Sequence, residues 1–191
     1  RSVTLYTSSF SFGVGLSFLV AQVAADRLGW RSAFLITGMG PLVMVAVCLA
    51  MGPVKPVGTK RPLLDFGPVV RNRPALGFIL GYGAHCFELY GVRTWIVAFW
   101  TFVAAREPVS VLFSPLTVSV VFSLLAMPSS ILGNEAAMRF GRYRALTILM
   151  LASALLAIGI AFSVTAPPFV LLALLLLYAV TVPADSGALT S

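Results

Sequence analysis

The sequence predicts an all-helical membrane protein with six membrane-spanning helices. Of its 191 residues, 59% are hydrophobic and only 10% are charged, whereas soluble domains are about 45–50% apolar and about 25% charged. The mean hydropathy is +0.99, and the apolar residues form stretches long enough to cross a bilayer, which takes about 20 residues. A water-soluble core of this size could not bury so much apolar surface, so lipid is the expected solvent.

The first two spans are free of charge and are followed by a polar connection. Residues 3–25 form the first span, which stops before Asp26 and Arg27, and residues 32–54 form the second. The stretch 55–74 then combines four prolines with six charged residues. Because proline and charge interrupt an apolar helix, this stretch is the predicted boundary between two domains.

Four more spans follow the polar connection. The third, 75–105, contains ionisable residues, and the fourth, 109–134, contains Pro115. The stretch 145–184 has no charge for about twice the length that one crossing helix needs. Its polar and proline-rich residues at 165–168 divide it into a fifth span and a sixth.

Lys and Arg give this topology an orientation. Nine of them fall on the side that holds Arg1, the connection 55–74 and the loop after the fourth span, against three on the other side. Short cytoplasmic loops are enriched in Lys and Arg. Both ends are therefore predicted to face the cytoplasm, in a multi-pass protein of the cell inner (plasma) membrane.

The third span carries His85, Glu88 and Arg93. Ionisable groups at this depth cost at least a few kcal/mol each, so a functional site is the first hypothesis. Glu88 and Arg93 are five positions apart, roughly 140° around a helix, and do not share one face. Three interpretations stay open: the charges hold the bundle together, Arg93 binds an anion while Glu88 or His85 exchanges a proton, or all three line a water-filled cavity.

Two loops carry a resemblance to a known family. The run ADRLGWRSAFLITG at 25–38 and the run GNEAAMRFGRYRA at 133–145 are similar to loops of the major facilitator superfamily (MFS). In the second run Arg139, Gly141 and Arg142 match the cytoplasmic gating loop of that family. Met138 stands where the family has an aspartate, which puts any role of that carboxylate in doubt.

The resemblance implies that the spans are helices five to ten of a twelve-helix, two-domain MFS bundle. Residues 1–54 would end the first six-helix domain, 55–74 would be the cytoplasmic linker, and 75–191 would begin the second domain. The partners would be the bilayer, a small-molecule substrate and the missing helices of a parent chain. The implied function is secondary transport of a small solute by alternating access.

Candidate site residues come from the third and sixth spans. The positive charge of Arg93 favours a small anion or carboxylate, and Tyr90 or Trp95 could stack on it. Asp185 lies between Pro183 and Gly187, where the backbone can open, so its carboxylate either faces the cavity or caps the residues 186–189. The candidate substrate-binding residues are Arg93, Tyr82 and Trp95, and the candidate proton-coupling residues are Glu88, His85 and Asp185.

Several other functions are not expected. The sequence has no phosphate-binding loop and no cluster of metal ligands, so neither an enzymatic activity nor a cofactor or metal is predicted. Cys48 and Cys86 lie inside apolar spans and are interpreted as small buried hydrophobes. The basic residues lie in short loops between spans, which argues against nucleic-acid binding. The alternative function is a complete six-helix channel or a structural membrane subunit.

Overall fold

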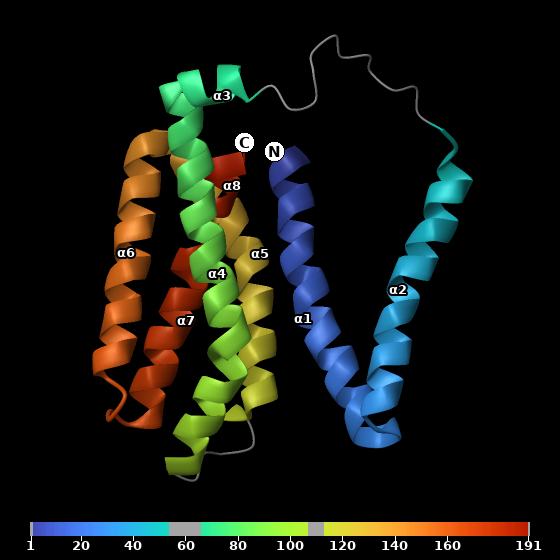
Figure 1. Ribbon diagram of the computed structural model, residues 1–191. Helices are drawn as coiled ribbons and strands as arrows, with labels where there is room; N and C mark the ends of the chain where they lie inside the picture. Colours follow the sequence, from blue (N-terminus) through green and yellow to red (C-terminus); the bar gives the residue numbers. More distant parts are fainter. Residues whose placement is uncertain (1, 54–65, 107–112, 191) are drawn as a thin grey trace. The chain divides into compact units, whose positions relative to one another are not determined.

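A computed structural model of the chain describes residues 2–53, 66–106 and 113–190, and within these ranges every regular element is a helix (Figure 1). The described helices are α1 (Ser2–Leu28), α2 (Trp30–Met51), α3 (Gly67–Arg71), α4 (Arg73–Arg106), α5 (Pro115–Phe140), α6 (Arg142–Phe162), α7 (Pro168–Ala184) and α8 (Ser186–Thr190).

The predicted fold class, an all-α membrane protein, is confirmed. Within the described ranges, five helical stretches are long and apolar enough to cross a membrane: in α1, α2, α5 and α6, and across α7 and α8 together. The predicted third span forms α4, a helix of 34 residues that would measure about 51 Å. Helix α4 is not among the five stretches that are apolar enough to cross a membrane, because the polar residues His85, Glu88 and Arg93 lower its hydropathy.

The boundary of the fourth span differs from the prediction. Pro115 does not lie inside the helix but begins α5, and the Ser114 side chain caps it by accepting a hydrogen bond from the backbone N–H of Thr117. Proline suits the first helical turn because its missing N–H is not needed there. The helix also continues beyond Asn134 to Phe140, since no residue in that stretch breaks it.

The predicted linker is described only in its second half. Residues 54–65, which include Lys55, Lys60, Arg61 and Asp65, lie outside the described residues. The short helix α3 occupies part of the remainder. The division of the chain at 55–74 into the ends of two six-helix domains stays a prediction.

By its internal contacts, the chain divides into two compact units. The smaller unit covers residues 20–80 and contains the apolar helix α2. Gly29 separates α1 from α2 with a φ of 84°, a conformation that glycine adopts without steric cost. The larger unit comprises residues 1–19 and 81–191 and holds all the candidate substrate-binding and proton-coupling residues.

The core of the larger unit lies among α4, α5, α6 and α7, which run side by side in Figure 1. Its largest side chains with almost no exposure are Trp100, Phe122 and Leu171. The outer face of α6, by contrast, exposes apolar side chains at helical spacing. These are Ile148, Leu151, Leu155 and Ile158. A surface of this kind fits contact with lipid acyl chains rather than water.

Helices α5 and α7 approach each other closely at Gly133. A Cβ atom at this position would lie 1.8 Å from the carbonyl oxygen of Ala184, so only glycine fits. One turn away, the hydroxyl groups of Ser130 and Ser186 are 2.9 Å apart and hydrogen-bonded. This contact fixes the end of α7, where the helix gives way to α8 at Asp185.

Candidate functional site

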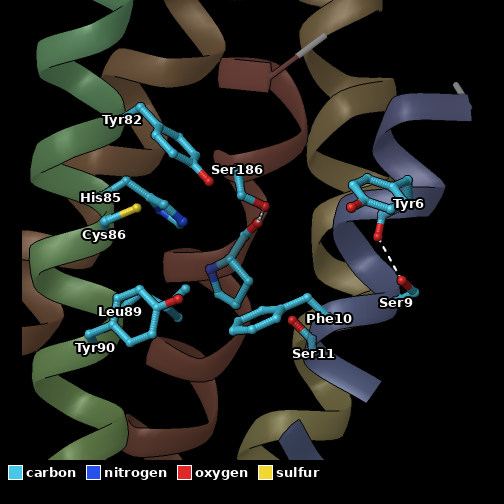
Figure 2. Close-up of a pocket in the computed structure, with 11 residues that line it drawn as sticks. Tyr6, Ser9, Phe10, Ser11, Tyr82, His85, Cys86, Leu89, Tyr90 and Ser186 are labelled. Atoms are coloured by element: carbon cyan, nitrogen blue, oxygen red, sulfur yellow. Dashed lines mark hydrogen bonds between the residues drawn. The ribbon is translucent and has the colours of Figure 1, made fainter. Parts of the chain in front are cut away.

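A cavity of about 410 Å³ lies within the larger unit, between α1, α4 and the junction of α7 with α8 (Figure 2). Figure 2 shows Tyr82, His85 and Cys86 projecting from α4 toward the cavity. Phe10 projects toward it from α1, on the opposite side. Four of its eleven lining residues are aromatic, in a chain that is 12% aromatic. These are Tyr6, Phe10, Tyr82 and Tyr90.

Arg93 is buried against two residues that line this cavity. Its side chain is only 7% exposed. Its Nη2 atom donates a hydrogen bond to the hydroxyl oxygen of Ser11 at 3.2 Å, and its Cζ atom lies 5.2 Å from the centre of the Phe10 ring. Nε and Nη1 have no hydrogen-bonding partner among the described residues. A buried guanidinium with two unpaired nitrogen atoms is costly unless an anion completes its hydrogen bonds.

His85 and Asp185 form a second buried contact at the other end of the cavity. The Nδ1 atom of His85 lies 2.6 Å from an Oδ1 atom of Asp185, and both side chains are almost inaccessible. Neither atom has another hydrogen-bonding partner among the described residues. The structure thus joins two candidate residues that are 100 positions apart, because α7 ends beside α4.

Glu88 turns away from this cavity toward α6 and α7. Its Oε1 atom accepts a hydrogen bond from the Tyr178 hydroxyl at 2.8 Å, and its Oε2 atom accepts one from the Ser153 hydroxyl at 3.2 Å. Both oxygen atoms therefore have a neutral donor. The structure does not bring Glu88 and Arg93 together, which agrees with their angular separation on α4.

The two candidate aromatic residues occupy different places. Tyr82 lines the cavity, and its ring stacks on His85 with centroids 5.9 Å apart. Trp95 is 69% exposed and lines a separate, more apolar hollow of about 260 Å³ between α4, α6 and α7, on the side of Tyr178. Its predicted contact with substrate stays a prediction.

The candidate gating loop lies between α5 and α6. Arg139 is exposed in the last turn of α5, and Gly141 separates the helices with a φ of 90°. Arg142 begins α6. Close to this loop, Ala137 and Leu146 form a small core with Ala188 of α8. The loop therefore belongs to the same packed region as the α7–α8 junction, and its gating role stays a prediction.

Several residues that complete these contacts are not marked by any sequence pattern. The candidate site residues predicted from the sequence do not include four of them: Phe10 and Ser11 of α1, Ser153 of α6 and Tyr178 of α7. Serine and aromatic residues are common in apolar spans, so only their position marks them. A buried charge predicts that some partner exists, but not the helix that supplies it.

The sequence profile of the Major Facilitator Superfamily matches residues 1–190. No curated protein and no solved structure matched the chain. The profile spans nearly the whole sequence and agrees with the apolar helices described above. We conclude that this chain is a multi-pass membrane protein that belongs to the Major Facilitator Superfamily of secondary membrane transporters.

Proposed function

We propose that the cavity beside Arg93 binds a small organic anion, and that the protein transports this anion across the membrane by alternating access. One observation carries the proposal: the buried Arg93 guanidinium has two nitrogen atoms without partners among the described residues. A carboxylate can accept hydrogen bonds from two guanidinium nitrogens at once. Such an anion would neutralise the charge that the surrounding side chains leave uncompensated.

The other charged contacts support an anion rather than a cation. Asp185 is already paired with His85, which precedes Arg93 by eight residues, or about 12 Å along α4. Glu88 is occupied by hydroxyl groups of α6 and α7. Neither carboxylate is therefore in a position to neutralise Arg93.

The proposed coupling ion is a proton, carried by the pair of His85 and Asp185. The imidazole and the carboxylate lie 2.6 Å apart, so one proton can be shared between them. The pair lies at the junction of α7 and α8, and interrupted helices are typical of transporter sites. The interpretation treats the chain as six of twelve helices, the others coming from a parent chain.

Uptake into proteoliposomes tests the role of Arg93. The full-length protein is assayed with labelled acetate, succinate and benzoate, and with glucose as a neutral solute. We expect one or more anions to enter, and Arg93→Gln to reduce that uptake at least about tenfold, because a charge-assisted pair is worth about 1.5–3 kcal/mol. Arg31→Gln is the matched control, since Arg31 is exposed and lies over the Trp30 ring.

Two outcomes would contradict the proposal. One is uptake of glucose with no uptake of any anion. The other is anion uptake that Arg93→Gln leaves unchanged, which would favour a structural role for the charge. A channel would be recognised by uptake that does not saturate with solute concentration and shows no exchange across the membrane.

A further inference from the structure

We infer that the anion carries an aromatic ring, so that the substrates of this cavity are aromatic monocarboxylates. The inference rests on the anion site proposed above and adds the chemical class of the remainder of the molecule. Arg93 lies behind Phe10 and Ser11 of the cavity wall. The carboxylate would reach Nε and Nη1 once these two side chains shift, and the ring would pack against Phe10 and Tyr90.

The aromatic wall lies next to the charge. The rings of Phe10 and Tyr90 are 6.4 Å apart and meet edge to face at 65°. Arg93 follows Tyr90 by three residues on α4, about 4.5 Å along the helix, and its guanidinium lies over the Phe10 ring. An aromatic carboxylate has the same two parts in the same order, a planar apolar body and a charged end.

The serine residues of the cavity offer few free donors to a sugar or another polyol. The Ser9 hydroxyl donates to the backbone carbonyl of Tyr6, and the Ser186 hydroxyl donates to that of Pro183. Ser11 accepts from Arg93. Sites for polyhydroxylated ligands need many available donors and acceptors, because each desolvated hydroxyl group must be paired. Here the serine hydroxyls are already engaged within the protein.

The same wall does not suit an organic cation. Aromatic rings attract cations through their faces, but the guanidinium of Arg93 already lies over the Phe10 ring. A second positive charge in the cavity would be repelled by Arg93. The volume, about 410 Å³, is within the range of small-molecule sites, roughly 300–1,000 Å³. A single ring with a short carboxylate therefore fits, with room for water.

Neither cysteine is buried as the sequence predicts, since Cys48 is exposed and Cys86 is partly exposed. Cys86 provides a direct reporter of occupancy, because its side chain lines the cavity. In the full-length protein with every other cysteine replaced by serine, the rate of alkylation by N-ethylmaleimide is measured in proteoliposomes. The added probes are benzoate, butyrate, benzamide and benzyltrimethylammonium at equal concentrations. Butyrate lacks the ring, benzamide lacks the negative charge, and benzyltrimethylammonium replaces it with a positive one, so the contribution of each feature to binding can be compared.

We expect benzoate to slow alkylation of Cys86 at about tenfold lower concentration than butyrate, because ring packing adds to the carboxylate contact. Benzamide and benzyltrimethylammonium should give little protection. Tyr90→Leu should reduce the preference for benzoate over butyrate. Phe87→Leu, which changes an exposed ring on the same helix, should leave the preference unchanged.

The outcomes separate the substrate class from the anion site. Equal protection by butyrate and benzoate, lost in Arg93→Gln, would overturn the aromatic class and keep the anion site. Protection by benzamide or by the ammonium probe equal to that by benzoate would overturn both. The same holds for protection by benzoate that persists in Arg93→Gln, and for no protection by either carboxylate.

Discussion

Helix α4 carries two polar regions that differ in how their charge is satisfied. On one side, Glu88 accepts hydrogen bonds from Ser153 and Tyr178 with both of its carboxylate oxygens. On the other side, Arg93 uses one nitrogen on Ser11 and leaves two without partners among the described residues. The hydrogen bonds of Glu88 are therefore complete within the protein, whereas those of Arg93 are incomplete among the described residues.

The difference shows that depth in the membrane does not by itself mark a binding group. Glu88 and Arg93 are five residues apart, but their faces differ by roughly 140°. One side chain therefore meets α6 and α7, and the other lies by α1 and the cavity. A buried charge whose hydrogen bonds are made within the protein needs no further partner, whereas a buried charge with unpaired donors carries an uncompensated cost.

The largest expected effect is on stability and comes from Gly133, where α5 packs against the end of α7 beside the cavity. In Gly133→Ala the new Cβ would lie 1.8 Å from the carbonyl oxygen of Ala184. The helices must separate, and we expect a loss of stability of about 3 kcal/mol, the upper end of the usual cost of overpacking, with Asp185 displaced from His85. The melting temperature in detergent measures this loss.

Gly159 of α6 is the matched control, because a Cβ there meets no atom within 4 Å. Gly159→Ala should be neutral or stabilising by up to about 1 kcal/mol. A Gly133→Ala protein that melts at the wild-type temperature would show that α5 and α7 are not held as closely as described.

A smaller effect is expected at the proposed coupling pair. His85→Gln and Asp185→Asn keep hydrogen-bonding groups but remove the shared proton. Anion uptake driven by an imposed pH gradient should fall about tenfold, a typical strength of coupling between two ligands, while exchange without a gradient falls much less. Asp26→Asn is the control, since Asp26 is exposed and bonded to Gln22. Equal loss in both assays would assign the pair to binding or folding.

The smallest effect is expected at Glu88. In Glu88→Gln the amide can still accept a hydrogen bond from Tyr178 and donate one to Ser153, so uptake should stay close to that of the wild type. Stability should fall by about 1 kcal/mol, because neutral hydrogen bonds replace charged ones. Gradient-driven uptake measures the effect on transport, and the melting temperature measures the effect on stability. Loss of coupling here would move the proton from His85 and Asp185 to Glu88, a possibility that the sequence leaves open.

The helical spans could be read from the sequence because each depends on local features. Gly29 separates the first two helices, and the residues 165–168 separate the last two, as expected from their chemistry. Pro115 is predicted to lie inside the fourth span but begins α5, because the residue order around a proline looks the same whether it begins a helix or lies within one. Its cap by Ser114 distinguishes the two.

The sequence by itself determined that lipid surrounds this chain, that its apolar stretches are helical, and that α4 carries charge where charge is expensive. Hydrophobicity and helix periodicity act over a few turns, so both are visible in the residue order. Only the tertiary structure decided which charges meet: Asp185 with His85, Glu88 with Ser153 and Tyr178, and Arg93 with Ser11. These contacts join residues 65 to 100 positions apart and depend on how neighbouring helices are rotated and where α7 ends, which no local pattern specifies.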